Sequence, residues 1–268
     1  MDKVVVLAAG LGTRMRSGQA EGLSEAQRQM VDRGVKAMVP IDRPFLDYVL
    51  TTVADAGLRH VCLVIGPDHD ELRQYYGAAL QAQRLDFEFA VQAEPLGTAN
   101  AVAAARDFAA GDPFLAINSD NHYPLQALQA LCRLSGPGLP GFERGALVAQ
   151  SNIPAQRIER FAVVEVDAEG SLRRIVEKPS AGLLAGLGDS IGVSMNCWRF
   201  DERIFAACDA IEPSARGEFE ITDAVQYAID HLGVCFTVVP IAAPVLDLTS
   251  RDDIAGVADR LRGMPVQL

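Results

Sequence analysis

The apolar residues of this chain fall into short β-branched runs that alternate with segments of helical spacing. The first run, 4–7, leads into a glycine-containing turn. Over residues 45–56 the apolar positions recur at helical spacing, and Gly57 follows as a helix-end signal. Because strands alternate with helices in this way, the pattern predicts a parallel sheet with helices on both faces. The further strands are expected at 61–65, 87–91 and 114–117, and the further helices at 68–79, 98–109 and 125–134.

After Pro140 the pattern changes to short strands that follow one another. Residues 167–170 have the composition of a hairpin turn between two of them. We therefore expect antiparallel additions on the parallel core and one domain over 1–268. The predicted strands are 146–150, 161–166, 172–176, 191–200 and 235–240, and the predicted helices are 201–208, 221–231 and 251–262.

Composition limits the classes of partner. The 268 residues are 49% hydrophobic and 22% charged, and the net charge is −11. Nucleic acids and anionic membranes select basic surfaces, so we expect neither as a partner. An anionic substrate would need local positive groups. A homo-oligomer is left open.

Cysteine usage and hydropathy indicate a cytoplasmic protein. The five cysteines include no Cys-x-x-Cys pair, which favours reduced core residues over disulfides or a zinc site. The first residues are too short for a signal sequence, and no apolar run approaches the length of a membrane span. The cysteines are Cys62, Cys132, Cys197, Cys208 and Cys235.

The turn after the first strand is a candidate phosphate site. Gly10 and Gly12 let the backbone approach a ligand, and Arg14 and Arg16 supply planar positive charge. The alternative is a plain strand–helix turn. A dinucleotide fingerprint would need glycine where Met15 stands, and a P-loop would end in Gly-Lys-Ser/Thr.

Residues 17–35 form a long polar excursion beside this turn. Ser24 and Gln27 match a capping box for a helix over 25–32. The segment is either a lid over a ligand or a solvated loop. As a lid it would be mobile, with Arg28 or Arg33 as a further phosphate contact.

Six motifs follow one another in a specific order, and together they resemble the sugar-1-phosphate nucleotidyltransferases. The resemblance extends from Val4 to about Val257. They follow the turn Gly10-Leu-Gly-Thr-Arg14, and the six motifs are Lys36-Ala-Met-Val-Pro-Ile41, Gln92-Ala-Glu-Pro-Leu-Gly-Thr-Ala99, Asn118-Ser-Asp-Asn121, Glu177-Lys-Pro179, Gly217-Glu-Phe-Glu-Ile-Thr-Asp223 and Val245-Leu-Asp-Leu-Thr-Ser250.

This resemblance implies a Rossmann-like, GT-A-like nucleotidyltransferase fold and transfer of a nucleotidyl group from a nucleoside triphosphate to a sugar 1-phosphate. It implies a nucleotide-binding half over 1–135 and a sugar-phosphate-binding half over 136–268. Its catalytic residues would be Arg14, Lys36 and Lys178, and its Mg²⁺ ligands Asp120 and Asp247. Its nucleotide-binding residues would be Leu7, Ala9, Gly10, Gly12, Thr13, Gln92, Gly97 and Thr98, and its sugar-phosphate-binding residues Asn121, Glu177, Gly192 and Glu218, with Glu220 as a weaker candidate.

Residue chemistry agrees with these roles. Two polyanions must meet, so catalysis is mainly positioning and charge neutralisation. A glutamine amide can pair with a base edge, and magnesium accepts a few carboxylates together with phosphate oxygens.

Departures from the family pattern leave the acceptor open. Segment 17–35 is about twice the usual length, and neither the Trp nor the Gly normally found around Asp247 is present. The acceptor is a hexose, heptose, cyclitol or amino-alcohol phosphate. Two other functions are weighed, a catalytically silent regulatory or binding subunit on the same fold and a nicotinamide-dependent oxidoreductase. The intact charged motifs argue against both.

Overall fold

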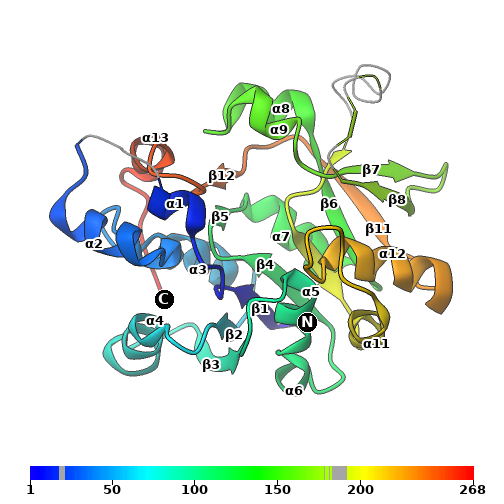
Figure 1. Ribbon diagram of the computed structural model, residues 1–268, viewed down its shortest axis with the longest axis horizontal. Helices are drawn as coiled ribbons and strands as arrows, with labels where there is room; N and C mark the ends of the chain where they lie inside the picture. The colour runs from blue at the N-terminus through cyan, green and yellow to red at the C-terminus, as the bar shows by residue number, and fades with distance from the viewer. Residues whose placement is uncertain (18–21, 178, 181, 183–191) are drawn as a thin grey trace.

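The computed structural model describes residues 1–17, 22–177, 179–180, 182 and 192–268 (Figure 1). Its strands are β1 (Lys3–Leu7), β2 (His60–Ile65), β3 (Asp86–Val91), β4 (Phe114–Asn118), β5 (Asn121–His122), β6 (Gly138–Glu143), β7 (Val163–Val166), β8 (Leu172–Val176), β9 (Gly192–Val193), β10 (Cys197–Phe200), β11 (Thr237–Ile241) and β12 (Leu246–Asp247). Its α-helices are α1 (Thr13–Ser17), α2 (Glu25–Arg33), α3 (Phe45–Asp55), α4 (Asp70–Gln74), α5 (Thr98–Ala103), α6 (Arg106–Ala109), α7 (Leu125–Arg133), α8 (Arg144–Gln150), α9 (Ala155–Ile158), α11 (Arg203–Ala210), α12 (Ile221–Leu232) and α13 (Asp253–Leu261). A 3₁₀ turn, η1 (Lys36–Met38), and a π-helical turn, η2 (Tyr75–Ala79), complete the set.

One mixed sheet runs through the molecule in the order β3-β2-β1-β4-β10-β6-β9-β7-β8, with β11 paired to β6. The first four strands are parallel, and β10 joins β4 in the antiparallel direction. Figure 1 shows the β7–β8 hairpin at one end of the molecule. A parallel core with mainly antiparallel additions confirms the predicted fold class, although β11 pairs with β6 in parallel.

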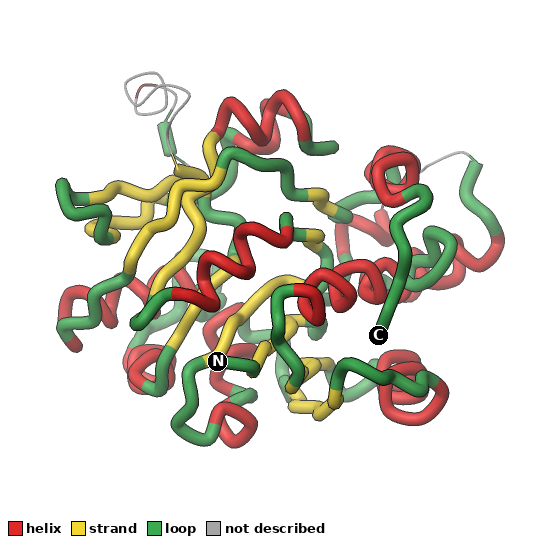
Figure 2. Tube along the Cα trace, turned by 180° about the vertical axis from the view of Figure 1, so that it is seen from behind, coloured by secondary structure: helices red, strands yellow, loops and turns green. Residues whose placement is uncertain are grey.

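Helices cover both faces of this sheet, as Figure 2 shows. Successive side chains of β1 point to opposite faces. Val4 and Val6 belong to the apolar cluster that contains α3, and Val5 belongs to the cluster that contains α5 and α12. The parallel strands are therefore buried on both sides, which explains their continuous apolar runs.

Three predicted elements are interrupted in the structure. The helix expected over 98–109 is α5 and α6, and the one over 68–79 is α4 followed by η2. The strand expected over 191–200 divides into β9 and β10, and Asn196 between them has a left-handed φ of 51°. The Tyr123 hydroxyl donates to the Met195 carbonyl at this break, over 2.8 Å.

One predicted strand was wrong. Residues 146–150 lie in helix α8, and the strand is β6, just before it. The β6 sequence contains Gly138, Pro140 and Gly141, which are typical of turns. Here the small residues allow close packing, because a Cβ on Gly141 would lie 2.9 Å from Val238 Cγ1.

Three of the cysteines are buried as expected, namely Cys62, Cys197 and Cys208. Cys132 is half-buried and Cys235 is exposed, so the core assignment was wrong for Cys235. Within the described ranges, no helix has the length and apolar character needed to cross a bilayer.

We predict that Gly192→Ala destabilises the β6–β9–β7 region by about 1–3 kcal/mol, the usual cost of overpacking. A Cβ at position 192 would lie 2.7 Å from Val164 Cγ2. The free energy of unfolding in urea measures the cost. Val164→Ala combined with Gly192→Ala should recover part of the loss, because it removes the clashing methyl group. Strictly additive losses would contradict this account.

Candidate functional site

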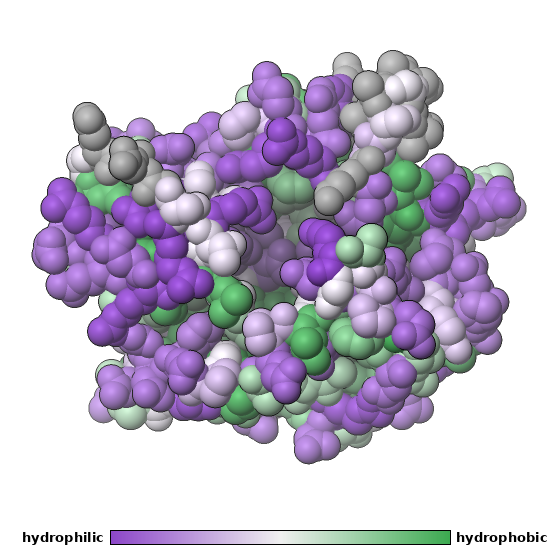
Figure 3. Space-filling model, in the orientation of Figure 1, coloured by the Kyte–Doolittle hydropathy of each residue, from purple (hydrophilic) through white to green (hydrophobic). Residues whose placement is uncertain are grey.

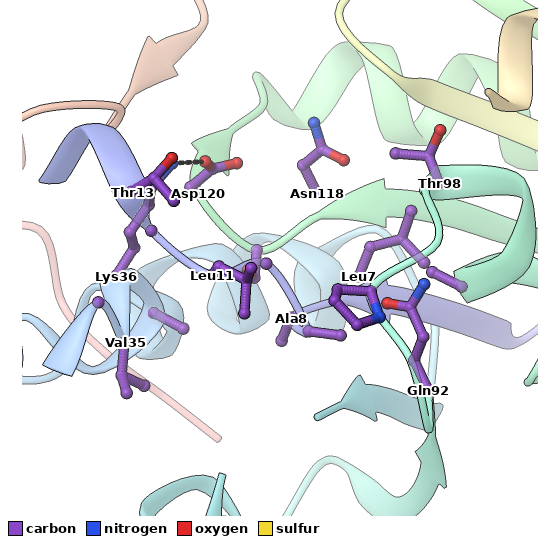
Figure 4. Close-up of a pocket in the computed structure, with 18 of the residues that line it drawn as sticks. Leu7, Ala8, Leu11, Thr13, Val35, Lys36, Gln92, Thr98, Asn118 and Asp120 are labelled. Atoms are coloured by element: carbon purple, nitrogen blue, oxygen red, sulfur yellow. Dashed lines mark hydrogen bonds and ion pairs between the residues drawn. The ribbon is translucent and has the colours of Figure 1, made fainter. Parts of the chain in front are cut away.

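A pocket of about 360 Å³ opens at the carboxyl ends of β1 and β4, where open α/β sheets place their ligands. Figure 3 shows a hollow near the middle of this face, and Figure 4 shows the side chains that line it. The lining residues are Leu7, Ala8, Ala9, Gly10, Leu11, Gly12, Thr13, Gly34, Val35, Lys36, Ala37, Gln92, Pro95, Gly97, Thr98, Ala101, Asn118, Ser119, Asp120 and Glu218.

The glycine-containing turn forms one wall of the pocket, as the motif predicted. Gly12 has a left-handed φ of 59°, and its α-carbon faces the backbone of Gly34 so closely that a Cβ would collide with it. Gly34 is similarly close to Leu11, since a Cβ added to Gly34 would lie 2.5 Å from the Leu11 carbonyl oxygen. Gly10 has free space beside it. Gly12 and Gly34 therefore brace the turn against the end of α2.

Lys36 and Asp120 form an ion pair at one end of the pocket, with 2.7 Å between Nζ and Oδ2 (Figure 4). Lys36 begins η1, and Asp120 follows β4. Both side chains are largely buried, at 16% and 23% exposed. The pair places one cation and one carboxylate beside the glycine-containing turn, where an anion or a metal ion can exchange partners with them.

Gln92 stands at the opposite end of the pocket (Figure 4). Its Nε2 donates to the Gly97 carbonyl and to Asn100 Oδ1, both over 2.9 Å. Because a carbonyl only accepts, Nε2 must face Gly97, and both amide protons are used. The buried Gln92 therefore offers the pocket its Oε1, a hydrogen-bond acceptor.

The Gly97–Thr98 loop is fixed by a segment from much later in the chain. Phe219 N donates to Leu96 O over 2.7 Å, and Ala99 N donates to Phe219 O over 2.9 Å. The Thr98 hydroxyl accepts from Ile221 N, so it caps α12 and not its own helix. A Cβ on Gly97, whose φ is 116°, would lie 2.5 Å from Phe219 O, so only glycine fits there.

Strand pairing brings Asp120 and Asp247 together. In the β5–β12 pair Asp247 lies opposite Asn121, and Leu248 N donates to Asp120 O over 2.8 Å. Burial and the charge of Asp120 raise the pKa of Asp247 to about 6, although the Thr249 hydroxyl and Arg157 act in the opposite direction. Two neighbouring carboxylates that repel one another fit a divalent cation, which would relieve that repulsion. The described residues hold no cluster of three or more His, Cys, Asp or Glu side chains, so phosphate oxygens and water would complete the coordination of a metal ion.

A protein-family model described as nucleotidyl transferase matches residues 3–240. The chain belongs to the nucleotidyl transferase family. A glucose-1-phosphate thymidylyltransferase of Streptomyces griseus is 31% identical over 231 residues, which are 85% of this chain and 57% of that protein. The low-salt glycan biosynthesis nucleotidyltransferase Agl11 of Haloferax volcanii is 29% identical over 241 residues, which are 85% of this chain and 59% of that protein. The chain thus spans less than two thirds of these curated relatives, and the matches confirm the resemblance inferred from the six motifs.

Solved structures share the fold of this nucleotidyl transferase. A UDP-glucose pyrophosphorylase complexed with UDP-glucose superposes with a TM-score of 0.75 at 17% identity, covering 99% of this chain and 100% of that one. A UTP-bound UGPase from Acinetobacter baumannii gives a TM-score of 0.72 at 17% identity, covering 99% and 95%.

The predicted nucleotide-binding residues of this family member all line the pocket, as do Lys36, Asp120 and Glu218. Glu218 is expected on the sugar side, and that role stays a prediction. Glu220 pairs with Arg216, and burial is the main cause that raises the Glu220 pKa.

The other predicted site residues that the structure describes are not among the lining residues. Arg14 is exposed on α1, and Glu177 is exposed after β8. Asn121 is buried in β5 and accepts from Asn118 Nδ2 over 3.1 Å. Gly192 is in β9, where packing on Val164 already requires a small residue. Lys178 lies outside the described residues.

Segment 17–35 is anchored more firmly than its composition suggested. The capping box of Ser24 and Gln27 is present, and Val31 and Leu23 are buried in the core. Arg33 pairs with Glu71. Residues 18–21 lie outside the described residues, and the lid hypothesis stays a prediction.

Several residues around Asp247 carried no sequence signal. Asn152 and Arg157 contact it from the α8–α9 region, part of which was predicted as a strand. Arg251 donates to the Met15 and Arg16 carbonyls at the end of α1 and pairs with Asp32 of α2. Arg251 follows Asp247 by only four positions in the sequence (251 − 247), and this short separation is the sequence feature that could have drawn attention to Arg251.

We predict that Asp247→Asn stabilises the metal-free protein above pH 6. The pKa of Asp247 is about 6 in the native state and about 3.9 in the unfolded state. Between these two pH values the carboxyl group is protonated in the native state and ionised in the unfolded state. The parent protein therefore loses stability as the pH rises from about 4 to 6. Above that window the variant should be more stable by about 3 kcal/mol, and below pH 4 the difference should vanish.

Urea unfolding in EDTA, at several pH values, measures this difference. Asp42→Asn, at an exposed position, is the control variant. A stability difference for Asp247→Asn that does not change with pH would contradict the assignment.

Proposed function

We propose that this chain transfers a nucleotidyl group from a nucleoside triphosphate to a sugar 1-phosphate or a similar phosphate acceptor, giving an NDP-sugar and pyrophosphate. One observation carries the proposal. The same pocket has the Lys36–Asp120 pair at one end and the buried Gln92 amide at the other. A nucleoside triphosphate has a matching polarity, with a polyanion at one end and a flat base edge at the other.

The names of the relatives support the same reaction, since they include glucose-1-phosphate thymidylyltransferases. In the proposal, residues 1–135 hold the nucleotide and residues 136–268 hold the acceptor. The backbone from Gly10 to Thr13 binds the triphosphate. Lys36 leaves Asp120 and pairs with the phosphates near the α-phosphorus.

The base is held at the Gln92 end. Gln92 Oε1 accepts an N–H from the base edge, because both Nε2 protons are already bound within the protein. Gly97 lacks the Cβ that would clash with the Phe219 backbone, and the Phe219 contact keeps that loop in place at the base end of the pocket.

In the reaction, an oxygen of the acceptor phosphate attacks the α-phosphorus in line, and the bond from that phosphorus to the β-bridging oxygen breaks. The electron pair leaves with pyrophosphate. The acceptor phosphate is already ionised near neutral pH, so no general base is required. Arg14 neutralises the leaving pyrophosphate, Lys178 binds the acceptor phosphate, and Glu177 binds the acceptor hydroxyls.

Asp120 and Asp247 are the proposed ligands of a divalent cation, with Mg²⁺ as the expected ion. When bound, the ion would neutralise phosphate charge and link the nucleotide to its attacking partner. Their adjacency in β5–β12 and the raised pKa of Asp247 support this role.

Pyrophosphate release tests the whole proposal. The common nucleoside triphosphates are combined in turn with a panel of sugar, cyclitol and amino-alcohol phosphates in the presence of Mg²⁺. Release that depends on both substrates supports nucleotidyl transfer and names the pair. Nucleotide binding without release under any combination would instead support a silent regulatory subunit.

We predict that Asp120→Ala and Asp247→Ala each abolish most turnover with Mg²⁺ present, because the metal would lose half of its protein ligands. The control is Asp209→Ala, since Asp209 pairs with Arg106 on the surface. Full activity of either pocket variant in the pyrophosphate assay would refute the metal assignment.

We also predict that the two phosphate sites separate kinetically. Arg14→Ala should weaken nucleoside triphosphate binding, and Lys178→Ala should weaken acceptor binding. Each should lower the rate by roughly 10²–10³-fold, as expected for the loss of a preorganised charge. Michaelis constants for the two substrates are measured for each variant. Impairment of both variants toward the same substrate would show that one role is misplaced.

A further inference from the structure

Arg157 of α9 lies between two buried carboxylates. Its Nη1 and Nη2 donate to the two oxygens of Asp253 over 3.0 and 2.8 Å. Its Nε is 3.5 Å from Asp247 Oδ2, and it is buried without any closer hydrogen-bond partner among the described residues. The Nε, which makes no hydrogen bond, therefore lies within ion-pair distance of the carboxylate that we assign to the metal.

Asp253 fixes Arg157 to the turn that follows Asp247. Oδ2 of Asp253 also accepts hydrogen bonds from Thr249 N, over 3.1 Å, and from Ser250 N, over 2.7 Å. The positive charge of Arg157 is thus offset by Asp253, and its planar fork is held in one orientation. The contact of Nε with Asp247 fixes geometry more than it adds charge.

Asn152 holds the backbone of Asp247. Its Nδ2 donates to Asp247 O over 2.8 Å, and Asp247 N donates to its Oδ1 over 2.9 Å. The segment from Asn152 to Arg157 therefore contacts both the peptide and the carboxylate of Asp247. Thr249 donates to the other carboxylate oxygen, Oδ1, over 2.7 Å.

We propose that Arg157 is a positioning residue for metal binding. It keeps the Asp247 carboxylate directed toward Asp120 against their mutual repulsion, while Asn152 fixes the backbone beneath it. This inference rests on the proposed metal role of Asp120 and Asp247. Groups that orient metal ligands typically change metal affinity by about 10–100-fold when they are removed.

The test compares Arg157→Gln and Arg157→Lys with the parent protein. Mn²⁺ is titrated in the presence of a non-hydrolysable nucleoside triphosphate analogue, and free Mn²⁺ is measured by electron paramagnetic resonance. We expect both variants to bind Mn²⁺ about 10–100-fold more weakly. The lysine variant should not restore affinity, because an ammonium group lacks the planar fork that spans Asp253 and Asp247.

Arg106→Gln is the matched control. Arg106 contacts both oxygens of Asp209 over 2.7 Å, and this surface pair is remote from the pocket. Its Mn²⁺ affinity should equal that of the parent. Urea unfolding of every variant shows whether it is folded at the assay temperature, and Arg157→Lys retains the charge if Arg157→Gln does not fold.

Asp247→Asn in the same titration separates this inference from the proposed function. If Asp247→Asn loses Mn²⁺ binding and folded Arg157 variants keep the parent affinity, the positioning role is overturned and the metal site stands. If Asp247→Asn binds Mn²⁺ as tightly as the parent protein does, the metal assignment fails, and the role of Arg157 fails with it.

Discussion

The repulsion between Asp120 and Asp247 is the constraint on which the rest of the site depends. The two carboxylates come from positions 120 and 247, and only the short β5–β12 pair brings them together. Burial of the Asp247 carboxylate is the main cause that raises its pKa to about 6, and the charge of Asp120 adds to it. A fold selected for stability alone would avoid this arrangement, and the cation that we propose for the site would relieve the repulsion.

Two cationic side chains contact these carboxylates. Lys36 neutralises Asp120 from the pocket side, and Arg157 contacts Asp247 from the opposite side. Lys36 lines the pocket and can exchange its partner for a phosphate. Arg157 donates to both carboxylate oxygens of Asp253, which hold its guanidinium in place. The site therefore combines one exchangeable cation with one fixed cation.

The pocket could be predicted from the sequence because the residues that form it directly follow strands. The turn after β1, Gln92 after β3 and Asp120 after β4 all stand at one sheet edge, and alternation of strands and helices is enough to predict that edge. Residues that act through long-range contacts were not predictable. Arg157 and Asn152 reach Asp247 from a segment whose apolar residues favoured a strand, and β6 was hidden by glycines that packing requires. The pairing of Phe219 with Leu96 was likewise not predictable, because it joins segments far apart in the chain.

That pairing also determines how the protein can diverge. Leu96 and Phe219 exchange backbone contacts, Thr98 caps α12, and Gly97 fits only because it has no side chain. The wall at the Gln92 end of the pocket is thus built jointly by an early loop and a late one. A chimera that joins the first half of one relative to the second half of another would create a mismatched wall. A change in the shape of this wall is therefore expected to require paired substitutions in both loops.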